Sequence, residues 1–107
     1  MRLYANCESA ELGTAMASRL ALSLSRFSPV QASVPKPYWK VPGLFEFTYW
    51  LSPASAASFR EVVSYSSGAW EHSSAGGELS SVWNRTTDHV FLIPEVTWAD
   101  LQLYEVA

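Results

Sequence analysis

The chain has 107 residues, of which 49% are hydrophobic and 16% are charged, and ten acidic residues against seven basic ones give a net charge of −3. This length accommodates one domain, and the high apolar share excludes a disordered or purely solvating segment. The acidic balance disfavours direct nucleic-acid binding, because it repels phosphate groups, and it suits a basic partner. We therefore expect a single folded domain over residues 1–107.

Cysteine content and hydropathy indicate a cytoplasmic protein. Cys7 is the only cysteine and cannot form an internal disulfide, which favours a reducing compartment. The N-terminal residues lack the apolar core and the cleavage site of a signal peptide. The longest apolar stretch, residues 12–27, is interrupted by Arg19 and several serines, so it falls short of a membrane-spanning helix. We expect neither export nor membrane insertion.

The first expected elements are a strand and a helix. Alternation of Leu3, Ala5 and Cys7 with a second set of residues predicts a strand over residues 2–7. Ser9 then suits the N-cap of a helix over residues 10–26. Apolar side chains recur along one side of this helix, which predicts that it packs on a sheet. They are Leu12, Met16, Leu20, Leu24 and Phe27.

A proline-rich loop separates this helix from the strongest strand signal. Four prolines between residues 29 and 43 remove backbone donors, which leaves room for only a brief edge strand over 38–41. Over residues 44–51, alternation of apolar and mixed side chains predicts a half-buried strand. Ser52 followed by Pro53 then predicts the N-cap and first position of a second amphipathic helix, over residues 53–67.

The last third of the chain is expected to be β. Two glycines at 76 and 77 predict a tight turn between strands over 70–74 and 79–85. An apolar run over 90–93 precedes the final strand, over 97–106, in which apolar residues alternate with a mixed set. The apolar residues of this final strand are Ala99, Leu101 and Leu103, and the mixed residues are Trp98, Asp100, Gln102 and Tyr104.

These elements predict an α+β fold. It is a two-layer sandwich in which both helices cover one face of a mainly antiparallel sheet of five to six strands. The order of elements suggests a ferredoxin-like arrangement with added strands. If the helices cover Phe47 and Leu101, the opposite face of the sheet carries Trp50, Trp98 and Asp100.

The last quarter of the chain has a recognisable pattern. A Trp-Asn-Arg strand end at residues 83–85 is followed by the apolar run 90–93, by Pro94 and Glu95, and by the alternating final strand. This pattern resembles small bacterial immunity proteins encoded beside polymorphic or contact-dependent growth inhibition toxins. The resemblance implies a protein that neutralises a cognate toxin domain by covering its active site or its substrate surface.

The uncovered face of the sheet is the predicted partner-binding surface. Large aromatic residues beside carboxylates are unlike a plain solvated surface, and Trp and Tyr dominate binding energy in interfaces. A basic toxin domain would complement the carboxylates. The predicted centre of the contact is Trp50, Trp98, Asp100 and Tyr104, with Glu46 and Glu95 around it.

Other interpretations of the same residues remain open. The loop over 29–43, or a second copy of the chain, would also cover the aromatic rings. The main alternative function is a self-associating, homodimeric domain that holds a small ligand on the aromatic face. A sheet that stacks RNA bases is a further alternative, but Glu46 and Asp100 would repel phosphates.

Catalytic and metal-binding patterns are weak. His72, with Asp88 next to His89, provides the acid and base groups of a small hydrolase, but no Ser or Cys lies in a nucleophile turn. Neither histidine has further ligands at the spacing of a metal site. Cys7 fits a small buried hydrophobe. We therefore expect no enzyme, no catalytic residues, no metal and no cofactor.

Overall fold

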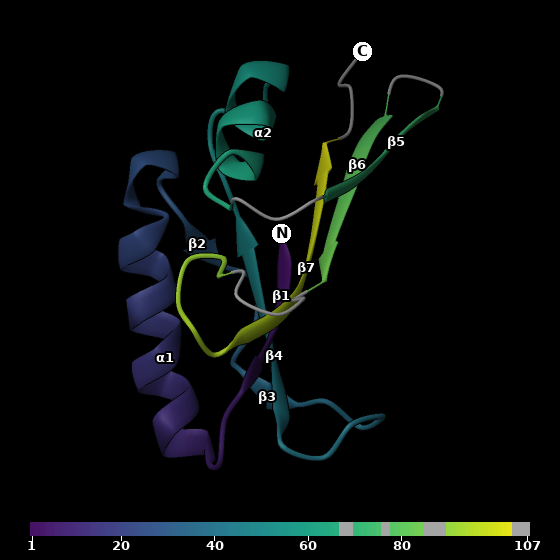
Figure 1. Ribbon diagram of the computed structural model, residues 1–107. Coiled ribbons are helices and arrows are strands. Elements are labelled where there is room, and N and C mark those ends of the chain that lie inside the picture. Colours follow the sequence, from purple (N-terminus) through teal and green to yellow (C-terminus); the bar gives the residue numbers. More distant parts are fainter. Residues whose placement is uncertain (67–69, 76–77, 85–89, 104–107) are drawn as a thin grey trace.

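The computed structural model describes residues 1–66, 70–75, 78–84 and 90–103 (Figure 1). Within these residues the chain forms two α-helices, a short 3₁₀ helix and a seven-stranded antiparallel sheet. The helices are α1 (Ala10–Ser23) and α2 (Ala56–Val63), and the 3₁₀ helix η1 is Ser25–Phe27. The strands are β1 (Arg2–Asn6), β2 (Val30–Gln31), β3 (Lys36–Pro37), β4 (Leu44–Trp50), β5 (Trp70–Ala75), β6 (Glu78–Asn84) and β7 (Val96–Leu103). The α+β prediction is confirmed.

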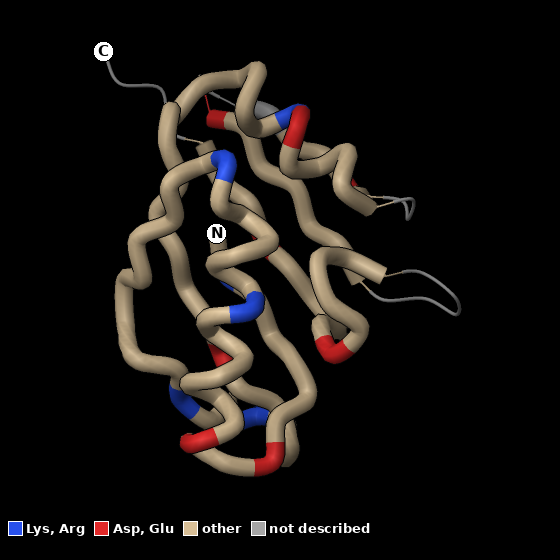
Figure 2. Tube along the Cα trace, turned by 90° about the vertical axis from the view of Figure 1, so that its left-hand side faces the viewer, with Lys and Arg blue, Asp and Glu red and all other residues tan. Residues whose placement is uncertain are grey.

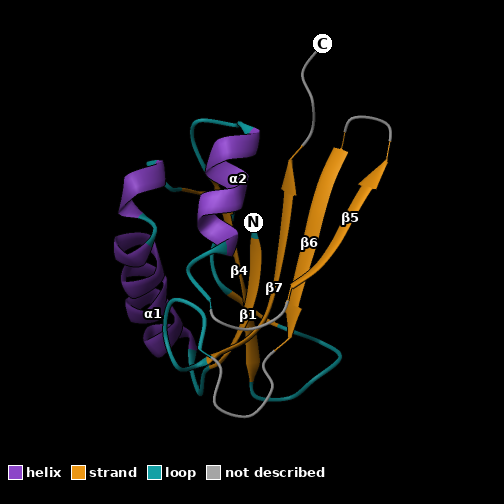
Figure 3. Ribbon diagram, turned by 45° about the horizontal axis from the view of Figure 1, so that its top comes forward, coloured by secondary structure: helices purple, strands orange, loops and turns teal. Residues whose placement is uncertain are grey.

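Both helices cover the same face of the sheet (Figures 1 and 3). The hydroxyl of Tyr49 on β4 donates a hydrogen bond of 2.7 Å to the Ala17 carbonyl of α1. Phe47 and Leu101, on the same face, are buried in the core. The alternating pattern of β4 and β7 therefore assigned the covered face correctly.

The order of the strands in the sheet is β2-β4-β1-β7-β6-β5, and β3 also pairs with β4. Helix α1 lies in the chain between β1 and β2, which have β4 between them in the sheet. Helix α2 follows β4 in the chain, and after the β5–β6 hairpin the chain enters β7, which has β1 between it and β4 in the sheet. These split crossovers agree with the suggested ferredoxin-like arrangement, and the β5–β6 hairpin extends the sheet beyond β7.

Helix α1 begins where the sequence predicts. The Ser9 side chain accepts a hydrogen bond of 3.2 Å from the Leu12 backbone N–H. The prediction that Leu12 belongs to the buried stripe is wrong, because its side chain is 51% exposed. Gly13 faces the sheet instead, and a Cβ there would lie 3.2 Å from the ring of Phe45. The small residue allows the helix to approach the sheet closely.

The boundaries of both helices differ from the prediction. The expected helix over 10–26 ends as α1 at Ser23 and continues as η1. The second helix does not use Ser52 as its cap, because the Ser55 side chain accepts from the Ser58 N–H at 3.2 Å. It ends at Val63, where the Ser64 hydroxyl donates to the Glu61 carbonyl at 2.6 Å and closes the last turn. Neither described helix is long and apolar enough to cross a membrane.

One predicted strand is moved by the structure, and one further strand was not predicted. The edge strand expected over 38–41 lies instead at 36–37, and residues 30–31 form an edge strand that the sequence did not predict. The apolar run over 90–93 contains only an isolated bridge between Phe91 and Ile93. Phe91 is fully buried between Trp70 and Trp83, with ring centroids at 5.1 and 5.7 Å. This run fills the core rather than extending the sheet.

The β5–β6 hairpin pairs as predicted from Trp70 opposite Trp83 to Ala75 opposite Glu78. Its turn at 76–77 lies outside the described residues, as do the segment 85–89 and the chain after residue 103. The expected extension of the last strand to residue 106 therefore reaches beyond the described residues.

Candidate partner-binding face

The face of the sheet opposite the helices, hereafter the open face, contains a cluster of aromatic rings. The ring centroid of Tyr4 on β1 lies 5.0 Å from that of Trp98 on β7. It lies 4.4 Å from that of Tyr38, which precedes β4. Pairing of the three central strands aligns these residues, because Tyr4 stands opposite both Glu46 on β4 and Trp98 on β7. Two of the predicted contact residues therefore lie around one buried tyrosine.

The loop between β3 and β4 covers part of this cluster. Its Tyr38 N–H donates to the Leu44 carbonyl at 2.8 Å, which holds the loop against the start of β4. As a result Tyr4 is 8% exposed, and Trp98 is only partly exposed. The interpretation in which the loop over 29–43 covers the rings thus applies to this end of the face.

Polar groups occupy the middle of the open face. Arg2 on β1 stands opposite Thr48 on one side and Asp100 on the other. A hydrogen bond with the Tyr4 side chain raises the pKa of Arg2, while burial raises the pKa of Tyr4. The Tyr4 hydroxyl also lies 3.5 Å from the Glu46 carboxylate. These contacts orient Arg2 and Glu46 along the face.

Asp100 has an unusual environment for a carboxylate. Its Oδ2 accepts a hydrogen bond of 3.4 Å from Gln102. Its Oδ1 is shielded from water and has no hydrogen-bond partner among the described residues. A buried acceptor without a donor is energetically unfavourable.

The opposite end of the open face is apolar and uncovered. Trp50 at the end of β4 is 67% exposed, and its cross-strand neighbour Val30 on β2 is 61% exposed. Directly opposite residues of two strands share a face, so these side chains form one exposed apolar patch. Among the predicted contact residues that the structure describes, Trp50 is therefore the most accessible.

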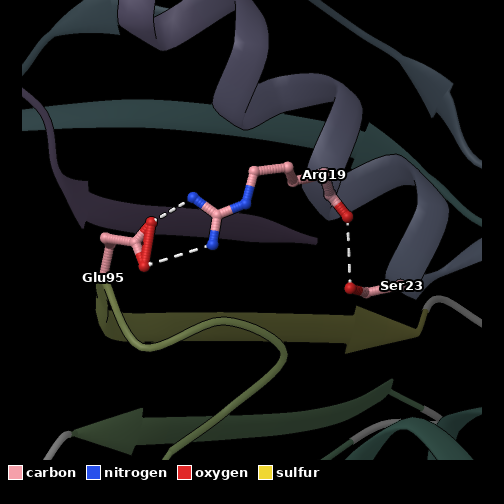
Figure 4. Close-up of polar contacts among 3 residues, drawn as sticks. All are labelled: Arg19, Ser23 and Glu95. Atoms are coloured by element: carbon pink, nitrogen blue, oxygen red, sulfur yellow. Dashed lines mark hydrogen bonds and ion pairs between the residues drawn. The ribbon is translucent and has the colours of Figure 1, made fainter.

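Glu95 lies away from the open face. Its carboxylate forms a two-point ion pair with the Arg19 guanidinium of α1, on the helix side of the sheet (Figure 4). The longer of the two contacts, from Arg19 Nη2 to Glu95 Oε1, is 3.4 Å. We therefore remove Glu95 from the candidate face. Tyr104, the remaining predicted contact residue, lies outside the described residues.

Four aromatic or apolar residues at or beside this face escaped the sequence prediction, and Tyr38 of the cluster is one of them. Tyr4 shares a face with Glu46 and Trp98, and the alternation in the first strand was the available signal. Trp39, in the loop after β3, is 82% exposed, with the Lys40 ammonium 5.1 Å from its ring centroid. No periodic pattern identifies a loop residue such as Trp39. Val30 lies in a strand of two residues, which is too short to show an alternating pattern in the sequence.

A cavity of about 460 Å³ lies where the open face meets α2. Phe59 and Val62 of α2 form part of its wall. Trp50 and Asp100 also line it, so it reaches the uncovered end of the open face.

The described side chains that were considered for catalysis make contacts typical of a structural role. His72 Nδ1 lies 2.5 Å from the hydroxyl of Ser81, and Ser81 is fully buried, so a substrate has no access to that hydroxyl. His89 lies outside the described residues. The Cys7 thiol is buried and donates to the Ser9 carbonyl at 3.2 Å. Among the described residues no group of three or more His, Cys, Asp and Glu side chains is arranged to hold a metal ion.

Charge is distributed without a dominant sign on the helix side. Seen from the side of α1, basic and acidic positions are both scattered over the described chain (Figure 2).

Comparison of the chain with family models, with curated proteins and with solved structures found no match.

Proposed function

We propose that this protein is an immunity protein that binds a cognate toxin domain and neutralises it by covering the toxin's active site or substrate surface. The observation that supports a binding role best is the open face, where exposed Trp50 and partly exposed Trp98 flank a partly desolvated carboxylate, Asp100. The assignment to toxin immunity rests on the pattern of residues 81–105.

Binding through this face follows from the distribution of its groups. Trp50 and Val30 offer an apolar area on paired strands, and rigid aromatic groups lose little conformational entropy on binding. Asp100 and Glu46 add two carboxylates to the same face. The positive charge of a lysine or arginine on a basic toxin domain would complement them. Inhibition then requires no chemical step, because the bound protein excludes the toxin's substrate.

The test is binding to the toxin domain encoded by the neighbouring gene, measured by calorimetry together with inhibition of the toxin. Trp50→Ala should weaken binding by about 2 kcal/mol or more if Trp50 is a hot spot. Leu22→Ala is the matched control, because Leu22 on α1 is 76% exposed on the helix side. Equal affinities of both variants and the wild type would remove the open face from the interface. The absence of any binding to that domain would reject the immunity function.

The ligand-binding alternative has the cavity beside α2 in its favour. A Val62→Phe substitution would fill part of that cavity, because Val62 lies in its wall. Under the immunity proposal this variant, if folded, retains toxin binding. Under the alternative it loses the binding of small apolar probes such as benzyl alcohol, measured by NMR titration.

A further inference from the structure

The two edges of the sheet differ in how they are protected. On one side, the strands next to β4 are β2 and β3, each two residues long, and prolines at 29, 35 and 37 lie in or beside them. Short strands and prolines prevent a further strand from pairing at an edge. This edge is therefore protected against association.

The other edge is β5, which has none of these features. It is six residues long and contains no proline, lysine or arginine. Its register with β6 is continuous from Trp70 to Ala75, and within the described chain no strand pairs with its outer side. Glu71, His72 and Ser73 are all exposed. A regular, unprotected edge strand is a template for another strand.

We propose that β5 pairs antiparallel with β5 of a second copy of this chain, so that two sheets join into one. Two identical strands related by a twofold axis necessarily run antiparallel, and such an interface closes after two subunits. Because the edge of each copy is the same strand, the second copy matches it in length and in spacing of backbone donors and acceptors. A second copy of the chain is therefore the partner that we propose for this edge.

The side chains restrict the register of this pairing. If the axis is perpendicular to the sheet, directly opposite residues lie on the same face, so Ser73 can stand opposite Ser73 of the second copy. Glu71 then stands opposite Ala75, and His72 opposite Ser74. No charged residue faces a like charge. The register shifted by one pair instead places the two His72 side chains opposite each other, which is unfavourable when they are protonated.

This dimer differs from one formed through the aromatic residues. In the β5 dimer, the helices of both copies lie on one side of the joined sheet and both open faces lie on the other. Trp50 and Trp98 remain exposed to the same extent as in the monomer. The proposal is therefore independent of the toxin-binding function.

Disulfide trapping in the full chain tests the register directly. With Ser73 on the axis, two introduced cysteines have Cβ atoms about 4.5 to 5.5 Å apart, so Ser73→Cys should give a covalent dimer under mild oxidation. Ser80→Cys is the matched control, because Ser80 is the β6 residue directly opposite Ser73. In the dimer, the two Ser80 positions are separated by one additional strand spacing in each copy, which adds about 10 Å to their distance. They are therefore too far apart to form a disulfide. Cys7 is buried and present in both variants.

Sedimentation analysis tests the dimer without cross-linking. The wild type should dimerise reversibly as concentration rises into the millimolar range, as expected for a small interface. Ser73→Lys should abolish the dimer by placing like charges at the axis, and Ser80→Lys, with the same charge one strand inward, should retain it. A wild type that stays monomeric at millimolar concentration, or equal cross-linking of Ser73→Cys and Ser80→Cys, would overturn the proposal. Toxin binding that persists in Ser73→Lys separates the two functions.

Discussion

The hydroxyl of Tyr49 donates to the carbonyl of Ala17 at 2.7 Å and so connects β4 directly to α1 inside the core. Tyr49 is 1% exposed, and burial raises its pKa to about 12. The neutral phenol is thus the form that the fold accommodates. This contact joins the two layers of the structure and predicts how stability depends on pH.

We expect the free energy of unfolding to decrease between about pH 10 and pH 12. The pKa of Tyr49 is higher in the folded protein than the ordinary tyrosine value of 10.0, so folding favours the protonated phenol. Its contribution is complete below pH 10 and is lost as the pH rises through the folded pKa. Urea unfolding at several pH values, with Tyr49→Phe for comparison, measures this loss. An equally steep decrease in Tyr49→Phe would contradict the assignment to Tyr49.

At neutral pH, Tyr49→Phe should lower stability by about 0.5 to 1.5 kcal/mol. The substitution keeps the ring but removes the hydroxyl that donates to the Ala17 carbonyl. The expected loss is the net contribution of a typical intramolecular hydrogen bond. Thermal or chemical unfolding checks this value. Stability equal to that of the wild type would show that the hydrogen bond makes no net contribution.

Phe47→Ala and Leu101→Ala should each lower the free energy of unfolding by about 2 to 5 kcal/mol, as large-to-small changes in the core do. The two side chains are 1% and 6% exposed. Gln102→Ala, on the exposed face of the same strand as Leu101, should change stability by about 0.5 kcal/mol or less. Equal small losses in all three variants would contradict the register of β4 and β7.

The ion pair between Arg19 and Glu95 should contribute about 0.2 to 1 kcal/mol to stability. The two side chains are 53% and 28% exposed, so water and salt screen their attraction. A double-mutant cycle with Arg19→Ala and Glu95→Ala at low and high salt measures the coupling. We expect it to decrease at high salt, and coupling that does not change with salt would contradict an electrostatic origin.

Within the proposed toxin complex, Asp100→Lys should mainly slow association and Trp98→Ala should mainly speed dissociation. Charges at an interface steer encounter in a salt-dependent way, whereas packed aromatic groups determine how long a complex lasts. Surface plasmon resonance at two salt concentrations separates the rates. Circular dichroism must confirm that Trp98→Ala is folded, because Trp98 packs against Tyr4. Unchanged rates in both folded variants would exclude this part of the open face.

Substitution of His72 or His89 by Ala should leave toxin neutralisation intact, because the proposed function needs no acid or base. His72 contacts the hydroxyl of Ser81, and this hydroxyl is buried, so no substrate reaches it. Toxin inhibition by each purified variant, with folding checked in parallel, is the measurement. Loss of inhibition by both folded variants would instead favour an enzymatic function.

Residues with strong local periodicity were predictable from the sequence alone. Alternation along residues 44–51 placed Phe45, Phe47 and Tyr49 on the covered face, and the Ser9 cap marked the start of α1. These features follow from the geometry of a single strand or helix, and any packing of the elements preserves them.

Other features depend on contacts between distant segments, which no local pattern contains. Ser55 rather than Ser52 caps α2, and Phe91 of the apolar run over 90–93 packs in the core next to Trp70 and Trp83. The candidate face was also decided by the tertiary structure. Pairing of β1 with β7 placed Tyr4 beside Trp98, and the loop after β3 covered it with Tyr38.

Glu95 shows most directly what the sequence determined and what it left to the fold. Its charge and its place before the last strand were evident from the sequence, and both suited an exposed carboxylate. Only the packing of α1 on the sheet brought Arg19 within reach, 76 residues earlier in the chain, and turned Glu95 to the helix side. The face on which a side chain lies is local within a strand, but at the end of a strand it depends on which distant group is close enough to bind it.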